Sequence, residues 1–324
     1  MQAIVRRHYG PPDVLRLEEI KKPAPLDKEV LIRVRAASVN PLDWHFMRGT
    51  PYLLRIGIGL GTPRSPQLGV DVAGQVEEVG RNVTQFKPGD DVFGACRGAF
   101  AEYARTPESK LVAKPSSVTF EQGASVAIAG LSALQALRDK GRLQPGQKVL
   151  INGAAGGVGT FAVQIAKSFG AEVTGVCSTR NLDMVRSLGA DCVIDYTQQD
   201  FTTTGQRYDL LLDCIGNHSL SACRHVLVPR GTFVGVGGST DAWGFVPLVG
   251  MFRTLAISPF ISQKIRGFLA KLTQSDLAFV SELMKSGKVT PVIDRTYPLT
   301  HVPQAIRYLE EGHARGKVVI TLDP

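Results

Sequence analysis

A glycine-rich turn lies between a short apolar run and a helix-like segment, and it limits this chain to few folds. Residues 151–159 read INGAAGGVG, and Ala154, Gly156 and Gly159 match the spacing of a nucleotide-binding fingerprint with alanine in first place. Glycines at this spacing let backbone N–H groups approach a pyrophosphate at the start of the following helix. The turn therefore predicts an α/β unit that binds a dinucleotide. A tight turn without a ligand is the alternative.

The flanking segments give this fingerprint its context. Residues 148–152, KVLIN, have the length and apolar character of a fully buried parallel strand. Apolar residues then recur at helical spacing from Val158 to Phe169, and Gly170 is well placed to end that helix. A second strand is expected at residues 171–177, AEVTGVC, which completes a strand–turn–helix–strand unit.

The end of that second strand favours one nicotinamide cofactor over the other. NAD-specific folds place an Asp or Glu there, about 20 residues beyond the glycines, to hold the ribose hydroxyls. This chain has Ser178, Thr179, Arg180 and Asn181 at that place, with no carboxylate before Asp183. A hydroxyl and a guanidinium offer charge-assisted hydrogen bonds to a 2′-phosphate, whereas a carboxylate would repel it. We therefore predict NADPH; a helix cap with a solvated Arg180 is the alternative.

Composition narrows the class of protein. The chain has 324 residues, 44% of them hydrophobic, which is enough for two domains with separate cores. No apolar run reaches the length of a transmembrane helix, and the first residues suggest a strand rather than a signal peptide, so a cytoplasmic location is expected. The five cysteines form no CxxC pair and suit a reducing compartment.

The formal net charge of +8 raises the question of a polyanionic partner. Basic residues are interspersed with acids, as in RLEEIKK and YLEEGHARGK, and no long block of one sign occurs. Nucleic acid is therefore not expected as the main partner. Part of the excess would suit a phosphorylated cofactor.

Three regimes follow one another along the chain. Up to about residue 122, short strand-like segments broken by Gly and Pro predict an irregular β domain. Strands then alternate with helices over residues 123–273, as in a doubly wound parallel sheet. Residues 274–324 supply two helices and a final strand, which we assign with residues 1–122 to the first domain.

Several motifs in this order resemble a known family. They are SVNPLDW, LGVDVAGQVEEVG, KPGDDVFG, GAAGGVG, VIDY and GHARGKVVI. Together they resemble the zinc-free, zeta-crystallin-like quinone oxidoreductase branch of the medium-chain dehydrogenase/reductase superfamily. The resemblance spans essentially the whole chain. It implies a GroES-like β domain followed by a Rossmann domain, with the cofactor in the cleft between them.

The positions that hold zinc in the alcohol dehydrogenases of this superfamily differ here. The matching places have Asn40 and the pair Val70–Asp71, which supply neither a thiolate nor an imidazole. The cysteine-rich zinc lobe is absent too, since only Cys96 lies in the first domain. We therefore expect no metal and a zinc-independent reaction.

Without a metal, hydrogen-bond donors must stabilise the negative charge that grows on the acceptor oxygen of a quinone or an enone. By resemblance, Asn40 lies at the nicotinamide end of the cleft, where its amide would donate to the substrate or orient the cofactor; an Asx turn before Pro41 is the alternative. Asp43 is expected to hold the loop rather than act as an acid. Tyr52 is the candidate proton donor, with plain packing as its alternative.

The resemblance also carries cofactor contacts over by position. The residues that match the pyrophosphate-binding turn are Ala155, Gly156, Gly157 and Val158. Ser178 and Tyr196 match residues that hold the 2′-phosphate. The lysine of some quinone reductases falls at Asn181 here, so the neighbouring Arg180 is expected to replace it.

The nicotinamide half of the cofactor is assigned to later segments. Gly216 and Gly237, at the ends of two expected strands, would let backbone approach it. His313, Ala314 and Arg315 match a C-terminal turn that reaches the cofactor in relatives, although a basic helix end would also explain them.

Residues 243–272 combine apolar side chains with four basic residues and no acid. An apolar lid over a flat substrate, a surface for a membrane or partner, and a homodimer edge or buried helix are all compatible with this pattern.

The sequence thus predicts an NADPH-dependent reductase of quinones or other α,β-unsaturated carbonyls, acting on a small apolar substrate. Two alternatives stay open. One is an NADPH-binding protein with a sensing, scaffolding or RNA-contact role, and the other is an enoyl thioester reductase.

Overall fold

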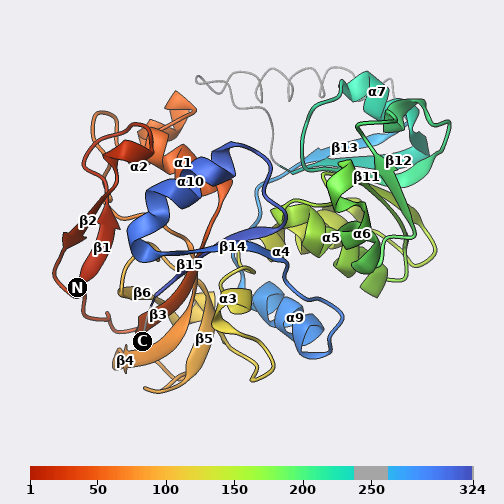
Figure 1. The fold of residues 1–324 in the computed structure, drawn as a ribbon. Coiled ribbons are helices and arrows are strands. Elements are labelled where there is room, and N and C mark those ends of the chain that lie inside the picture. The colour runs from red at the N-terminus through yellow and green to blue at the C-terminus, as the bar shows by residue number, and fades with distance from the viewer. Residues whose placement is uncertain (237–261, 323–324) are drawn as a thin grey trace. The chain divides into compact units, whose positions relative to one another are not determined.

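The computed structural model describes residues 1–236 and 262–322 (Figure 1). Contacts divide the chain into one unit of Met1–Leu131, Leu272–Gly287 and Pro291–Pro324, and a second of Ser132–Lys271 and Lys288–Thr290. The domain limits expected from the sequence fall after residues 122 and 273. Gly237 and most of the 243–272 segment lie outside the described residues, so their predicted roles stay predictions.

The first unit is built on a seven-stranded sheet in the order β14-β15-β3-β4-β5-β7, with β6 paired to β3. Its long central strand forms because EVLIRVRAASV is rich in β-branched and apolar residues, most of which are buried. The last strand pairs antiparallel with β3, as Val318 opposite Val39 shows, so the chain returns to its first sheet. The strands are β3 (Glu29–Val39), β4 (Asp71–Val79), β5 (Asp91–Ala95), β6 (Tyr103–Pro107), β7 (Leu111–Ala113), β14 (Ile293–Pro298) and β15 (Lys317–Thr321).

Shorter elements complete this unit. A separate hairpin is formed by β1 (Gln2–Val5) and β2 (Arg16–Glu19). The α10 helix packs its apolar face against the sheet, with Val302, Ala305 and Ile306 fully buried. The helices are α1 (Pro41–Arg48), α2 (Arg55–Ile58), α3 (Phe120–Gly123), α4 (Ala129–Gln135), which continues into the second unit, α9 (Gln274–Lys285) and α10 (Val302–Glu310).

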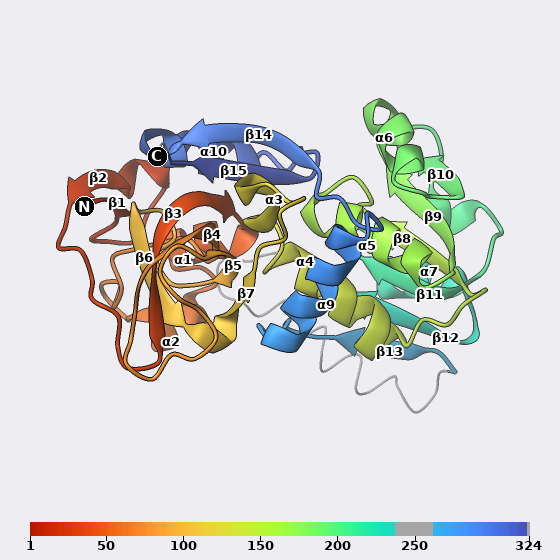
Figure 2. The ribbon, with the colours of Figure 1, turned by 90° about the horizontal axis from the view of Figure 1, so that it is seen from below.

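The second unit is a parallel sheet of six strands in the order β10-β9-β8-β11-β12-β13 (Figure 2). The predicted strand–turn–helix–strand unit is present as β8, α5 and β9. Burial of Phe161 and Ile165 on α5 stabilises this packing by about 1.5–3 kcal/mol for each side chain. The elements are β8 (Lys148–Asn152), α5 (Gly157–Ser168), β9 (Glu172–Cys177), α6 (Leu182–Ser187), β10 (Cys192–Asp195), β11 (Tyr208–Asp213), α7 (Leu220–His225), β12 (Leu227–Gly235) and β13 (Lys264–Gly267).

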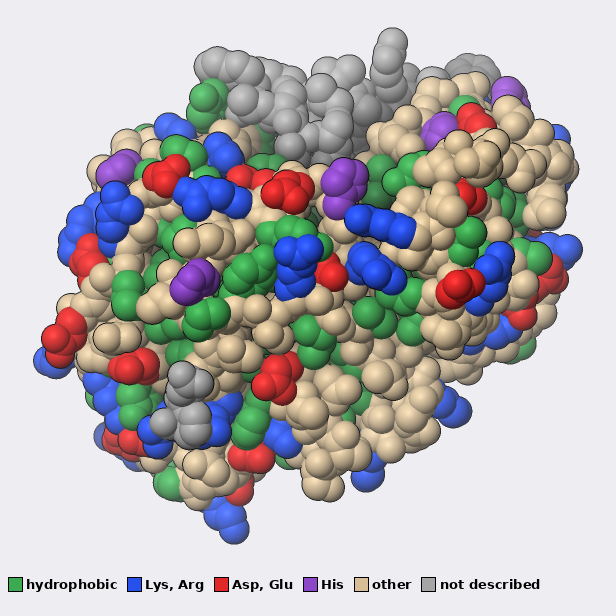
Figure 3. Space-filling view, viewed as in Figure 1, with side chains coloured by type: hydrophobic (Ala, Val, Ile, Leu, Met, Phe, Trp, Pro, Cys, Tyr) green, Lys and Arg blue, Asp and Glu red, His purple; other side chains and the backbone are tan. Residues whose placement is uncertain are grey.

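The predicted fold class, an α/β chain with a β domain and a Rossmann-like parallel sheet, is confirmed. Within residues 1–236 and 262–322, no helix is both long and apolar enough to cross a bilayer. Over the face drawn in Figure 3, Lys and Arg side chains are interspersed with Asp and Glu, as the sequence indicates.

Candidate functional site

The carboxyl ends of four parallel strands meet at one edge of the second unit's sheet. Register places Asn152 of β8 beside Asp213 of β11, and Asp195 of β10 beside Cys177 of β9. Ligands of open α/β sheets bind at this edge, where the strand order reverses, and here the reversal lies between β8 and β11. Predicted cofactor residues follow each of these strand ends: the Ala155–Val158 turn, Ser178, Tyr196 and Gly216.

The glycine turn has the backbone geometry that a pyrophosphate site needs. Gly153 has φ +86°, and a Cβ on Gly159 would lie 2.1 Å from the Gly153 carbonyl oxygen, so the turn itself requires both glycines. Gly156 begins α5 as its N-cap, and a Cβ there would meet only that oxygen, at 3.5 Å. The first N–H groups of a helix have no partner within it and favour an anion. The turn therefore fits a diphosphate.

The predicted 2′-phosphate residues lie on adjacent loops. The N–H of Tyr196 donates to the Cys177 carbonyl oxygen at 3.1 Å, which joins the loop after β10 to the end of β9. The Tyr196 side chain is 55% exposed. Asn181 Nδ2 donates to Ser178 Oγ at 3.1 Å, so the Ser178 hydroxyl can still donate its hydrogen outward. Arg180 is exposed beside them.

Asp195, which was not among the residues predicted from the sequence, is a neighbour of the loop that carries Ser178. Its carboxylate accepts hydrogen bonds from Thr179 Oγ1 at 2.5 Å and from the N–H and hydroxyl of Thr197 at 2.9 and 2.8 Å. The hydrogen bond from Thr179 is the main reason that the pKa of Asp195 is lowered. A negative charge thus stays beside the loop that carries Ser178, with both oxygens engaged by threonines.

A polar network built on the buried side chains of Asn152 and Asp213 occupies the switch point itself, and neither residue was predicted from the sequence. Asn152 Nδ2 donates to Asp213 Oδ1 and to Asn217 Oδ1, each at 2.9 Å. Asp213 Oδ1 also accepts the N–H groups of Ile215 and Gly216, at 3.1 and 2.9 Å, and so shapes the loop after β11. One feature of the sequence could have indicated this network: each of two apolar strands ends in a polar residue, Asn152 or Asp213.

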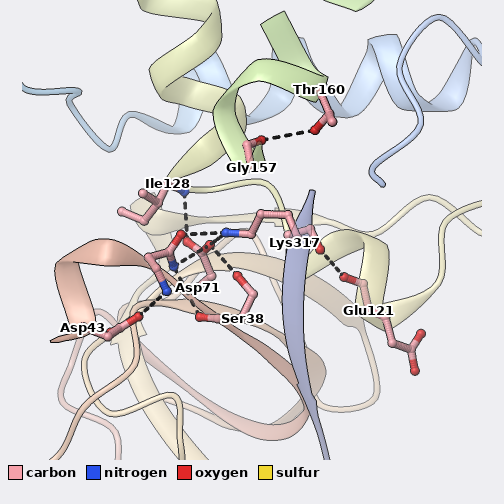
Figure 4. A network of polar contacts seen from close by, with 10 residues as sticks. Ser38, Asp43, Asp71, Glu121, Ile128, Gly157, Thr160 and Lys317 are labelled. Carbon is pink, nitrogen blue, oxygen red and sulfur yellow. Dashed lines mark hydrogen bonds and ion pairs between the residues drawn. The ribbon is translucent and has the colours of Figure 1, made fainter. Parts of the chain in front are cut away.

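The first unit holds a second polar network, formed where β15, β3 and β4 lie side by side (Figure 4). Lys317 Nζ donates to Asn40 Oδ1 at 2.6 Å and lies 3.3 Å from Asp71 Oδ2. Asn40 Nδ2 donates to Asp71 Oδ2 at 3.0 Å and to the Ser38 carbonyl oxygen at 3.3 Å. Both amide hydrogens and the amide oxygen of Asn40 therefore have partners inside the protein.

Burial isolates this network from water. Lys317 is 3% exposed, Asn40 2%, and Asp71 is fully buried. Asp71 also accepts hydrogen bonds from Ser38 Oγ at 2.8 Å and from the Ile128 N–H at 2.9 Å. A buried ion pair with this many hydrogen bonds fixes the geometry of the surrounding backbone. Lys317 was not among the predicted site residues, because 277 positions separate it from Asn40.

Asp43 lies at the first turn of α1 and holds two loops. Its carboxylate accepts the Asn40 N–H at 2.8 Å and the Gly69 N–H at 3.2 Å. Burial away from water raises the pKa of Asp43 to about 7. These contacts favour the loop-holding role over that of an acid.

Tyr52 begins a 3₁₀ turn, Tyr52–Leu54, and is 38% exposed. The guanidinium of Arg55 lies 4.8 Å from the centre of its ring. The same segment exposes Leu53, Ile56 and Leu60. Tyr52 therefore lies in a segment whose apolar side chains reach the surface.

The C-terminal turn is anchored within the first unit. The Arg315 N–H donates to Asp294 Oδ2 at 3.0 Å, and that oxygen also accepts the Tyr308 hydroxyl at 2.6 Å. Arg315 Nε is buried and has no hydrogen-bond partner among the described residues. His313 is exposed and Ala314 half-buried.

Among the described residues, no three His, Cys, Asp or Glu side chains gather as a metal-ligand set. Burial raises the pKa of the Cys96 thiol, so this cysteine stays protonated at neutral pH.

Comparison with known proteins identifies the family. The model of the alcohol dehydrogenase GroES-like domain matches residues 26–116, and that of the zinc-binding dehydrogenase matches residues 188–320. The chloroplast envelope quinone oxidoreductase homolog of Arabidopsis thaliana is 33% identical over 337 aligned residues, which cover 99% of this chain and 98% of that protein. The chain belongs to the medium-chain dehydrogenase/reductase superfamily.

Solved structures of this superfamily match over the whole length. The quinone oxidoreductase of Coxiella burnetii has a TM-score of 0.87 at 30% identity, covering 100% of this chain and 99% of that one. Escherichia coli quinone oxidoreductase, solved with NADPH, has a TM-score of 0.83 at 26% identity, covering 99% and 100%. This medium-chain reductase is therefore an oxidoreductase of the quinone oxidoreductase-like branch.

Proposed function

We propose that this medium-chain reductase uses NADPH to reduce a quinone or another α,β-unsaturated carbonyl compound, without a catalytic zinc. One observation carries the proposal: the glycine turn, Ser178 and Tyr196 follow neighbouring strand ends at one edge of the parallel sheet. The E. coli neighbour named as a quinone oxidoreductase complexed with NADPH supports it.

The residues of the second unit fit the cofactor that the proposal requires. The Ala155–Val158 turn would hold the pyrophosphate through backbone N–H groups. Ser178, Arg180 and Tyr196 would hold the 2′-phosphate by charge-assisted hydrogen bonds. When bound, the reduced nicotinamide supplies a hydride. The Asn152–Asp213 network would keep the Gly216 loop in the shape that this binding needs.

Residues of the first unit do not fit a catalytic zinc. The ammonium of Lys317 lies 2.6 Å from Asn40 Oδ1, and Asn40 stands at a position where the zinc enzymes of the superfamily have a ligand. A fixed positive charge opposes a divalent cation there, and an amide is a poor substitute for thiolate or imidazole. Hydrogen-bond donors, rather than a metal, would therefore stabilise the negative charge that develops on the acceptor oxygen.

The geometry favours different roles for the three candidate catalytic residues. Asn40 has its amide hydrogens engaged, so the proposal gives it the role of supporting the loop before α1. Asp43 holds the same loop. Tyr52, which belongs to a segment with exposed apolar side chains, is the candidate proton donor, with solvent as the other source of the proton.

Steady-state oxidation of NADPH with a panel of quinones, enones and enoyl thioesters tests the proposal. We expect turnover with quinones or enones and a higher kcat/KM for NADPH than for NADH. A higher kcat/KM for the enoyl thioesters would instead identify the protein as an enoyl thioester reductase. Tight cofactor binding without turnover on any acceptor would overturn the enzymatic proposal and favour the sensing or scaffolding role.

Two further predictions belong to the same proposal. A homodimer is expected if residues 243–272 form a subunit edge, and sedimentation equilibrium measures this. The cytoplasmic location is kept as a prediction, since the name of the Arabidopsis relative places that protein at the chloroplast envelope. Cell fractionation of the source organism would decide it.

A further inference from the structure

The second unit contains a cavity that the proposed function does not use. It has a volume of about 450 Å³ and lies at the amino ends of the parallel strands, the edge opposite to the glycine turn. Residues just before or at the start of β8, β11 and β13 line it. The helical turn Ala136–Gly141 and a bulge in β12 complete its wall.

Positive charge dominates the lining of this cavity. Two acidic residues line it, Asp139 and Asp209, against five basic ones: Lys140, Arg142, Arg230, Lys264 and Arg266. Asp139 binds Arg138 through both carboxylate oxygens, at 2.6 and 2.9 Å, and Asp209 accepts the Lys148 N–H at 2.9 Å. Within the described part of the chain, none of the five cations forms an ion pair with a carboxylate.

Backbone conformation singles out two of these arginines. Arg142 has φ +52° and Arg230 has φ +68°, and they are the only non-glycine residues with positive φ in the described ranges. An L-residue with a Cβ pays a steric cost in this region that glycine avoids. Such outliers concentrate where a side chain must be held in place for a ligand.

The two arginines reach the cavity from unrelated elements. Arg142 follows the helical turn as its C-cap. Arg230 lies in the bulge of β12, where Leu227 pairs with Tyr208 and Thr232 with Leu210, so the residues between them are in excess. The C-terminal end of a helix attracts nearby cations and would explain Lys140 and Arg142. It does not explain Arg230 or the two basic residues of β13.

We propose that this cavity binds a small polyphosphate anion, either an inorganic polyphosphate or the phosphate chain of a nucleotide. Guanidinium groups bind phosphate oxygens through two parallel hydrogen bonds, and two arginines that line one cavity from different elements suit two or more phosphates. The volume lies within the range of small-molecule sites, about 300–1,000 Å³. The site is separate from the cofactor edge, so this proposal stands independently of the proposed function.

Isothermal titration calorimetry on the full chain tests the proposal. Inorganic tripolyphosphate, ATP and monophosphate are titrated at low ionic strength with NADPH saturating, so that cofactor sites are filled. We expect tripolyphosphate to bind, with an affinity that falls as the salt concentration is raised. Its affinity should be at least tenfold higher than that of monophosphate. If ATP binds more tightly than tripolyphosphate, the ligand is identified as a nucleotide. If ATP binds equally or more weakly, the ligand is identified as an inorganic polyphosphate. No binding of either compound would overturn the proposal.

Variants separate the cavity from general surface charge. In the double variant Arg142→Gly with Arg230→Gly, tripolyphosphate affinity should fall at least tenfold while the thermal midpoint stays the same or rises, because glycine suits the positive φ. Lys264→Gln with Arg266→Gln should also weaken binding while it leaves that backbone unchanged. The charge-matched control, Lys21→Gln with Lys28→Gln in the first unit, should stay within twofold of the parent. Equal losses in the control and the cavity variants would overturn the proposal.

Discussion

The Asn40–Asp71–Lys317 network of the first unit and the loops that carry Ser178 and Tyr196 in the second unit differ in which polar groups they leave available to a ligand. In the first unit, Asn40, Asp71 and Lys317 are buried, and their polar groups bind one another. At the carboxyl edge of the second unit, Ser178 and Tyr196 reach the surface. A buried network whose polar groups all have partners inside the protein fixes backbone geometry. Polar side chains that reach solvent can exchange bound water for a ligand. We therefore expect the buried Asn40–Asp71–Lys317 network to position the chain, and we propose that the loops with Ser178 and Tyr196 bind the cofactor.

The largest effect is expected from Lys317→Met. It would leave the buried Asp71 carboxylate without the cation of its ion pair, and breaking a buried ion pair costs about 3–5 kcal/mol. Denaturant unfolding measures the loss in the free energy of unfolding. The double variant Lys317→Met with Asp71→Asn should recover part of it. A loss below about 1 kcal/mol would mean that the network contributes little to stability.

The pH dependence of stability tests Asp43 next. Because the folded pKa of about 7 exceeds the unfolded value, the folded state holds this proton more tightly. Its stabilising contribution is complete below about pH 4 and is lost as the pH rises through 7, by up to about 4 kcal/mol. Asp43→Asn cannot ionise, so the free energy of unfolding of the parent minus that of the variant should fall across this range. A constant difference would contradict the raised pKa.

The proposed 2′-phosphate residues are tested by the double variant Arg180→Asp with Ser178→Ala. Losing charged hydrogen bonds to the 2′-phosphate should weaken NADPH binding by about 2–3 kcal/mol and leave NADH binding much less affected. Fluorescence titration with both cofactors measures this selectivity. The exposed Arg16→Asp change in the first unit serves as a charge control. Equal losses for both cofactors would refute the phosphate assignment.

A smaller effect is expected from Tyr52→Phe. If the hydroxyl donates a proton, kcat should fall about tenfold, because solvent can partly replace a lost donor. The KM for the acceptor should change little, since the ring remains. Steady-state kinetics against a quinone measures both constants. An unchanged kcat would return Tyr52 to a packing role.

Chelators are expected to have no effect on activity, which is the smallest effect in this series. If the ammonium of Lys317 makes the Asn40 position unsuitable for zinc, prolonged treatment with EDTA should leave NADPH oxidation intact. Elemental analysis of the purified protein supplies the second readout. Stoichiometric zinc together with loss of activity on chelation would overturn the zinc-independent proposal.

The fold was more predictable than the sites. The glycine turn and its flanking apolar runs predicted β8, α5 and β9, because hydrophobic periodicity and turn chemistry are local properties. Local sequence also led to Ser178, and the family resemblance led to Tyr196, although their grouping on adjacent loops needed the strand register. Asn152 and Asp213 were missed because each is an ordinary polar residue in its own segment.

By itself, the sequence determined the parallel sheet, its nucleotide-type turn and the absence of zinc-type ligands at Asn40 and Val70. Only the tertiary structure decided that Lys317 neutralises the Asn40–Asp71 network and that the arginines at positions 142 and 230 face one cavity. The physical reason is distance along the chain. Contacts between residues far apart in sequence depend on strand order and register, which side-chain patterns in any single segment do not contain.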